Sequence, residues 1–184
     1  MAALLAAGCA QPPPKAPPTP EKPPVEALPP LPATFVNEPD CPGCLAVTVT
    51  LRADGSYLVR DELGTSEFYD FGRWRYVDGV LELAGGRDVR RYPLHSFRRA
   101  AQVESLRGPF RMVGLYDGAT FKECRTGLAW KLDDTRAAQT LEQEYLKRLE
   151  QPALVSLDAL FEGSPEMLRV LRPATLLNAR TCPG

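Results

Sequence analysis

Residues 45–61, LAVTVTLRADGSYLVRD, alternate apolar and polar side chains on both sides of an Asp-Gly step. Alternation with a period of two is typical of a strand that buries one face. Asp-Gly between two such runs predicts a tight hairpin, because glycine tolerates the positive φ that a primed turn requires. This stretch therefore predicts an antiparallel β protein.

The same pattern continues along the first half of the chain. Residues 71–94, FGRWRYVDGVLELAGGRDVRRYPL, carry short runs separated by Asp78-Gly79 and Gly85-Gly86. Short strands at this spacing predict an antiparallel meander that curls to protect its edges. We expect residues 33–104 to form a first small barrel, with Trp74 filling its core.

A second meander is predicted from Phe110. It turns at residues 117–118, and its last strand, residues 128–132, carries Trp130 for the second core. The period then changes, because residues 135–149 place apolar side chains on one helical face, with Thr135 and the two preceding aspartates as a cap. Strands resume at residues 153–161 and 167–171. Three strands, one helix and two more strands match an OB-type barrel.

The predicted fold class is therefore all-β with one helix, built as two small antiparallel barrels. The second domain covers residues 105–184. We place the boundary at residues 105–109, where the Gly108-Pro109 step resists both a helix and a central strand.

The first residues resemble the end of a bacterial lipoprotein signal. Residues 4–9, LLAAGC, resemble a lipobox, in which small residues precede a cysteine that receives diacylglycerol. Cys9 would begin the mature protein, and residues 1–8 would be the remnant of a signal peptide whose true start lies upstream. Acyl chains on Cys9 would anchor the protein stably. Ala10 after the cysteine favours the outer membrane, by resemblance to Gram-negative lipoproteins.

A proline-rich segment follows the lipobox. Residues 11–32 contain eleven prolines, so their backbone is largely confined to polyproline II. We interpret residues 9–32 as the lipidated cysteine and a tether, in preference to a ligand for a proline-recognition domain. No apolar run in the chain approaches the ~20 residues that a transmembrane helix needs.

Composition and motifs exclude several function classes. The net charge is −1, with no polyanion-binding bias, so nucleic acid is not an expected partner. Hydrolase signatures are absent and His95 is the only histidine, so no second histidine can complete an acid–base pair. We therefore expect a protein that is not an enzyme. One basic stretch is interpreted as a solvated strand face, with docking of an acidic partner or lipid headgroups as the alternative: Arg87, Arg90, Arg91, Arg98 and Arg99.

Cys41 and Cys44 are the candidate reactive or metal-binding pair. Without Cys9 the chain has an even number of cysteines, which is compatible with disulfides in an exported protein. A disulfide clip at the barrel entrance is the favoured interpretation. Two thiolates at this spacing could also bind Cu(I), so copper is the possible cofactor. Thiol exchange is the third alternative, although the thioredoxin context of a helix after CxxC is missing.

Short sequence motifs in both halves of the chain resemble those of the NlpE family. The first half carries Cys41-Pro-Gly-Cys44, then LRADGSY at residues 51–57, GRW at 72–74 and LEL at 81–83. The second half carries ATFKECRTG at residues 119–127 and LEQEYL at 141–146. Cys182 stands at the position of the family's last cysteine. The resemblance covers nearly everything after the tether.

The resemblance implies a lipocalin-like first barrel and an OB-fold second domain. It also implies a non-enzymatic lipoprotein that senses envelope, surface or redox stress and has an envelope sensor histidine kinase as partner. The expected location is the periplasmic face of the outer membrane. The alternative function is binding of Cu(I) or a small ligand in copper homeostasis.

The same resemblance implies a disulfide between Cys124 and Cys182. This bond would be the structural one of the two, because it closes a far longer loop than a bond between Cys41 and Cys44. In NlpE-like proteins this pair is linked to sensing failed disulfide formation. A staple without a signalling role is the open alternative.

Overall fold

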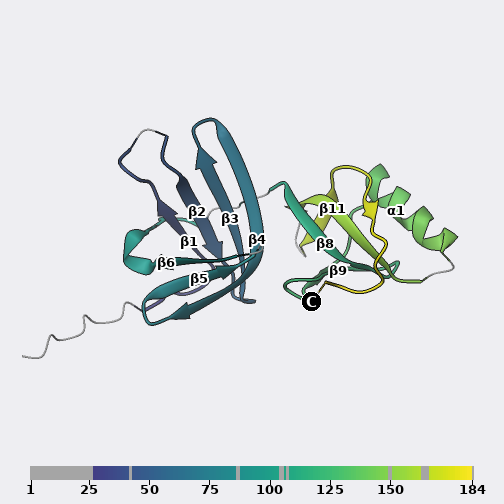
Figure 1. Cartoon of the computed structure of the whole chain (residues 1–184), viewed down its shortest axis with the longest axis horizontal. Helices are drawn as coiled ribbons and strands as arrows, with labels where there is room; N and C mark the ends of the chain where they lie inside the picture. Colours follow the sequence, from purple (N-terminus) through teal and green to yellow (C-terminus); the bar gives the residue numbers. More distant parts are fainter. Residues whose placement is uncertain are drawn as a thin grey trace, which may run out of the picture.

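The computed structural model describes residues 27–41, 43–85, 88–103, 106, 108–148, 151–162 and 166–183. The predicted signal remnant, Cys9 and most of the tether lie outside the described residues. Two curled antiparallel sheets and one α-helix make up the described fold (Figure 1). The predicted fold class is confirmed. No helix of the described part is long and apolar enough to cross a membrane.

The first sheet has the strand order β6-β5-β4-β3-β2-β1-β7. Its strands are β1 (Ala33–Asn37), β2 (Ala46–Leu51), β3 (Ser56–Leu63), β4 (Ser66–Val77), β5 (Val80–Ala84), β6 (Val89–Pro93) and β7 (Arg98–Arg99), with a 3-10 turn, η1 (Leu94–Ser96), before β7. Both predicted Asp-Gly turns form, with φ of 80° at Gly55 and 82° at Gly79. Among the described strands no pairing joins β6 to β7, so the sheet is a half-barrel.

One hairpin of this sheet was missed by the sequence prediction. Strands β3 and β4 pair from Ser56 opposite Arg73 to Leu63 opposite Ser66, which leaves Gly64-Thr65 as a two-residue turn. Gly64 has a φ of 61°, a conformation that glycine adopts without steric cost. The predicted second strand therefore continues past Asp61, and β4 begins before Phe71.

The core of the first domain lies on the concave side of this sheet. Val49, Leu51, Tyr57 and Val59 are fully buried there, and the partly buried Trp74 packs against this core. Leu28 and Leu31 also pack against this core. The last residues of the predicted tether therefore contribute apolar surface to the first domain.

The second sheet has the order β10-β9-β8-β11-β12, with β13 beside β11. Its elements are β8 (Phe110–Tyr116), β9 (Phe121–Glu123), β10 (Ala129–Trp130), α1 (Arg136–Lys147), β11 (Ala153–Glu162), β12 (Met167–Val170) and β13 (Thr175–Leu176). A parallel bridge between Leu132 and Leu168 brings the end of β10 to β12, as closure of a barrel requires. The predicted element order is found, with the short β13 added.

The helix forms as the sequence predicted. The Thr135 hydroxyl accepts a hydrogen bond from the Ala138 amide and caps the first turn. Ala138 and Leu141 are buried, and Tyr145 packs edge-on against Tyr116 of β8 at 5.7 Å. The helix is therefore held by its apolar face. Leu149, the last predicted contact of that face, lies outside the described residues.

Candidate functional site

The structure brings Cys124 and Cys182 together. Their sulfurs are bonded and their Cα atoms are 5.4 Å apart, although the two residues are separated by 58 positions. Cys124 follows β9, and its amide donates to the Val113 carbonyl of β8. Cys182 lies in the final segment, which runs back toward β9 (Figure 1). The bond therefore fastens the end of the chain to the second sheet.

Cys124 belongs to a short loop, residues 123–127, which we call the junction loop. Glu123 is completely buried, and its Oε2 accepts hydrogen bonds from the amide and the hydroxyl of Thr126, at 2.7 and 2.8 Å. The Gly127 amide donates to the Glu123 carbonyl. A buried carboxylate costs free energy unless it is paired. Glu123 is paired within its own loop, and this fixes the conformation of the loop.

Arg125 extends from the junction loop into the first domain. Its Nε donates to Glu123 Oε1 at 3.1 Å, and its Nη1 donates to Asp70 Oδ1 of β4 at 3.2 Å. Nη1 also donates to the carbonyl of Gly85, just after β5. Charge-assisted hydrogen bonds of this kind are stronger than neutral ones. One guanidinium therefore connects the two domains next to the disulfide.

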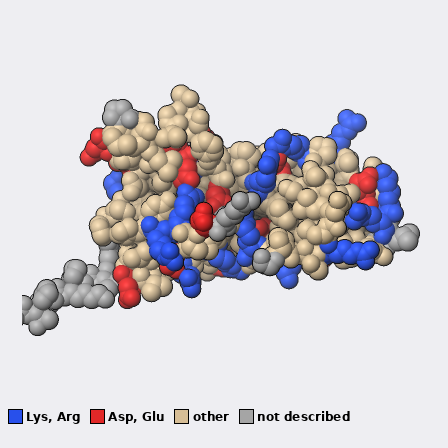
Figure 2. Space-filling model, viewed as in Figure 1, with Lys and Arg blue, Asp and Glu red and all other residues tan. Residues whose placement is uncertain are grey.

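Two further arginines connect the domains from the other direction. Arg73 of β4 donates to the carbonyl of Thr126 in the junction loop. Arg52, which follows β2, donates to Glu166 at 2.6 Å, and its guanidinium lies over the Phe161 ring. Figure 2 shows basic and acidic side chains intermixed along the region where the two domains meet. The domains are thus joined by directional polar contacts.

An apolar contact lies beneath these ion pairs. Phe71 of β4 is 1% exposed and packs at 5.6 Å from Trp130 and 5.5 Å from Phe161 of the second domain. Leu58 of β3 is buried in the same cluster. The core of the second domain therefore includes side chains of the first domain, and we call this shared region the junction.

Asp70 links the junction to the interior of the first domain. Its Oδ2 accepts a hydrogen bond from the buried Tyr57 hydroxyl at 3.2 Å. Burial, followed by the charge of Asp70, raises the pKa of Tyr57, so the phenol stays protonated and acts as a donor. Arg90 of β6 pairs with Asp61 at 2.6 Å and lies near Asp70.

The position of Arg90 corrects one prediction. A solvated strand face does not describe the whole basic stretch. The Arg90 side chain is only 27% exposed and belongs to the interior network, because the alternation of β6 places it on the concave side of the sheet. Arg91 and Arg98 do lie at the surface, where they pair with Glu82 and Glu38. Arg99 is exposed, and Arg87 lies outside the described residues.

Cys41 and Cys44 lie in the loop between β1 and β2, and their sulfurs are bonded. Both residues are exposed. No group of three or more His, Cys, Asp or Glu side chains that could hold a metal occurs among the described residues. His95 is exposed on η1, in a different part of the first domain. A metal bound here would therefore depend on the two sulfurs after reduction, which suits Cu(I) better than Zn(II).

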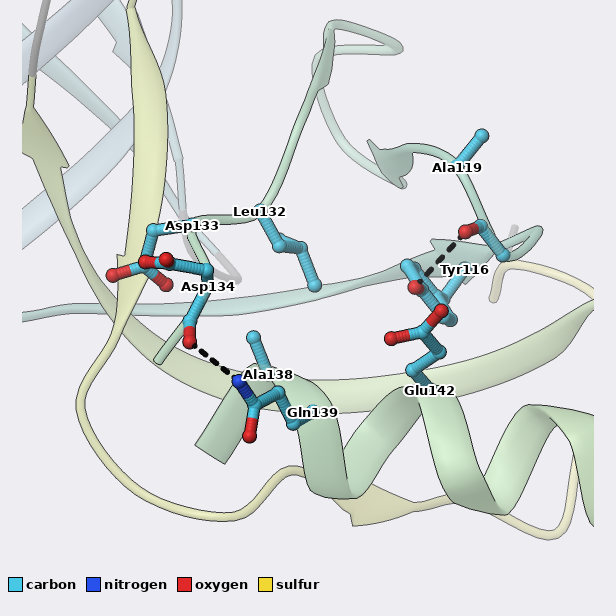
Figure 3. A pocket seen from close by; sticks show the side chains of 9 residues that line it. Tyr116, Ala119, Leu132, Asp133, Asp134, Ala138, Gln139 and Glu142 are labelled. Atoms are coloured by element: carbon cyan, nitrogen blue, oxygen red, sulfur yellow. Dashed lines mark hydrogen bonds between the residues drawn. The ribbon is translucent and has the colours of Figure 1, made fainter. Parts of the chain in front are cut away.

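A groove in the second domain separates the helix from β8 and its turn (Figure 3). Its volume is about 310 Å³. Asp133 and Asp134 lie at one end, and Glu142 lies at the other. The Asp133 carboxylate already accepts from the Thr135 hydroxyl and the Val170 amide. The acidic side chains are spread apart and partly used by the fold, so they define no metal site.

Both cysteine pairs were predictable from the sequence, whereas the junction was not predicted. One signal was present: residues 57–59, Tyr-Leu-Val, are three consecutive apolar residues in a strand that otherwise alternates. Tyr57 and Val59 fill the concave core, so Leu58 must face the other side of the sheet. An apolar side chain on the convex face indicates that something covers that face.

These features define a two-domain β protein in which a disulfide-linked OB-type domain is docked onto a curled sheet. Residues 100–181 match the family model described as the NlpE C-terminal OB domain. The NlpE resemblance is thus confirmed for residues 100–181, which match the model of the NlpE C-terminal OB domain.

Comparison with other proteins adds two findings. The crystal structure of the Cpx pathway activator NlpE from Escherichia coli is similar, at 20% identity and a TM-score of 0.39. The similarity covers 84% of this chain and 100% of that one. No curated protein matches the chain. The resemblance to the NlpE family therefore rests on the match of residues 100–181.

Proposed function

We propose that this protein is a non-enzymatic envelope-stress sensor that reports the state of its Cys124–Cys182 bond to a membrane partner. The observation that carries the proposal is the position of the bond. It closes a loop that contains most of the OB-type domain, from the end of β9 to the final segment, and it lies one residue from Arg125, which contacts the first domain. A change at the bond can therefore reach both domains.

The chemistry of a disulfide suits this role. A disulfide is retained or lost according to the redox poise of its compartment. When disulfide formation fails, newly exported protein would keep Cys124 and Cys182 as thiols, and its OB-type domain would lose its covalent constraint. The reduced population would then present a different surface from the oxidised one, which is the requirement for a signal.

The proposed location is the periplasmic face of the outer membrane. The lipobox at residues 4–9 and the proline-rich segment behind it support acylation of Cys9 and a tether. Mass spectrometry of the mature protein, expressed with its complete signal, would reveal a diacylated N-terminal cysteine. An unacylated or uncleaved mature form would remove the anchor from the proposal.

The proposed partner is an envelope sensor histidine kinase. This proposal is supported by the match to the NlpE C-terminal OB domain and by the NlpE-like sequence motifs in both halves of the chain. We expect Cys182→Ser to raise the output of an envelope-stress reporter, because it leaves the anchored protein permanently without the long-loop bond. Cys44→Ser is the matched control, since it removes only the exposed bond. Reporter output should be normalised to protein abundance. A silent reporter with Cys182→Ser at normal abundance would contradict signalling and leave the bond a staple.

A second proposal is copper binding at Cys41 and Cys44. It is favoured by the exposure of both cysteines and by the 5.6 Å between their Cα atoms, which allows two thiolates to reach one ion. Because reduction also frees Cys124 and Cys182, the test uses the full chain with both of these replaced by serine. We expect this reduced protein to bind one Cu(I) per molecule and a further Cys41→Ser substitution to abolish the binding. Competition with a colorimetric Cu(I) chelator measures the stoichiometry. Binding that is unchanged in Cys41→Ser would eliminate this site.

A further inference from the structure

Three consecutive side chains of the junction loop act on three different parts of the molecule. Glu123 points inward and fixes the loop, Cys124 is bonded to Cys182, and Arg125 reaches Asp70 and Gly85 of the first domain. A backbone this short cannot move at Cys124 without moving Arg125. The disulfide and the contact between the domains therefore share one rigid element.

We propose that Arg125 latches the first domain onto the second, and that the Cys124–Cys182 bond holds Arg125 in the latching position, so that reduction undocks the domains. The inference deepens the proposed function and rests on it for the redox input. In this proposal, the Arg125–Asp70 contact links reduction of the Cys124–Cys182 bond to the undocking of the two domains.

The groups that Arg125 contacts in the first domain are held in place by further contacts of their own. Asp70 Oδ1 accepts from the Phe71 amide at 2.8 Å as well as from Arg125, while Oδ2 accepts from Tyr57. The approach at Gly85 is close, because a Cβ placed there would lie 2.4 Å from Asp70 Oδ2 and 2.0 Å from the Tyr57 hydroxyl. Only glycine fits at that position, and the Gly85 carbonyl oxygen accepts a hydrogen bond from Arg125.

The bond is placed to control the latch because it attaches the end of the chain. In the described part of this segment, the last backbone hydrogen bond runs from the Leu177 amide to the Leu154 carbonyl. Beyond it, Cys182 is the covalent attachment to the junction loop. Reduction by a dithiol transfers two electrons and two protons to the cystine, giving two thiols, while the dithiol is oxidised to its own disulfide. The junction loop and the final segment are then no longer joined.

Undocking exposes the apolar part of the junction. Phe71 and Leu58 on the first domain would lose their contact with Trp130 and Phe161 on the second. On the first domain, this newly exposed face of β3 and β4 is flanked by Arg73 and Asp70, which lose their partners in the junction loop. An apolar face with charges at its edge is a surface that a partner protein can recognise.

Small-angle X-ray scattering on the purified full chain tests the latch. The background is Cys41→Ser with Cys44→Ser, so that a dithiol acts only on the long-loop bond. Arg125→Gln removes the latch with the bond intact, and Arg111→Gln is the matched control, because Arg111 is an exposed arginine that pairs with Asp158 inside the second domain. Circular dichroism verifies that each protein remains folded.

We expect the radius of gyration to increase in Arg125→Gln and in the reduced parent, and to stay unchanged in Arg111→Gln. Loss of the charge-assisted contacts should shift the docking equilibrium roughly tenfold. An oxidised Arg125→Gln protein that stays as compact as the parent would overturn the latch. A reduced, folded parent that stays compact would overturn its control by the bond. Neither outcome depends on a stress reporter, so failure of the latch is distinguishable from failure of the sensor function.

Discussion

Replacing both Cys124 and Cys182 by serine should lower the free energy of unfolding by about 4 kcal/mol, according to the chain-entropy relation for a loop of this length. The bond joins residues 58 positions apart, so its loss gives the unfolded chain a large increase in conformational freedom. Total stabilities of small domains are only about 5–15 kcal/mol. The OB-type domain should therefore become marginally stable. Urea denaturation followed by circular dichroism measures the change.

The matched control is the double replacement of Cys41 and Cys44 by serine. These residues are three positions apart, and the same relation gives about 2 kcal/mol at most for so short a loop. The loss should also be confined to the first domain, because the bond lies in the loop between β1 and β2. Equal losses for the two pairs, or no loss for the long loop, would contradict the structural role assigned to Cys124–Cys182.

Phe71→Ala should destabilise the protein by about 3–5 kcal/mol, the usual cost of deleting a buried phenylalanine ring. Phe71 is 1% exposed and touches the rings of Phe110, Trp130 and Phe161. Because these partners belong to the other domain, the substitution should also weaken docking. We expect one cooperative thermal transition for the wild type and two separate transitions for Phe71→Ala, measured by differential scanning calorimetry.

Phe35→Ala is the control for this prediction. Phe35 is 4% exposed, but its cluster contains only residues of the first domain. It should lower stability by a similar amount without altering docking, since no ring of the second domain contacts it. If Phe71→Ala and Phe35→Ala gave the same transitions, the junction would not be what couples the domains.

The fold was largely predictable because local signals determine it. Asp-Gly turns at Gly55 and Gly79 fixed two hairpins, and the cap at Thr135 marked the helix. The hairpin at Gly64 was missed, because its glycine comes first in a turn with threonine and lacks the Asp-Gly signature. Turn chemistry was therefore recognised only where the common pair was present.

The site was predictable only in its covalent part. The Cys41–Cys44 pair follows from its CxxC spacing, and the Cys124–Cys182 pair is what the NlpE resemblance implies. The contact between Asp70 and Arg125, by contrast, joins residues from different domains. Alternation indicates which face of a strand is buried but not what covers it, so Leu58 and Phe71 could not be assigned to a domain contact. Arg90 was misassigned for a related reason, since its partner Asp61 lies on a distant strand. The predicted boundary at residues 105–109 stays a prediction that limited proteolysis can test.

Differential thiol alkylation of the protein taken directly from the envelope tests the redox-sensor function most directly, when it is combined with a stress reporter in the same cells. Cys124 and Cys182 should be bonded in unstressed cells and free as thiols once disulfide formation is blocked, with reporter output rising in step. The Cys41–Cys44 pair serves as the internal comparison, because its state should not determine the output. A reporter that rises while Cys124 and Cys182 remain bonded, or that stays silent when both are free, would contradict the function proposed for this protein.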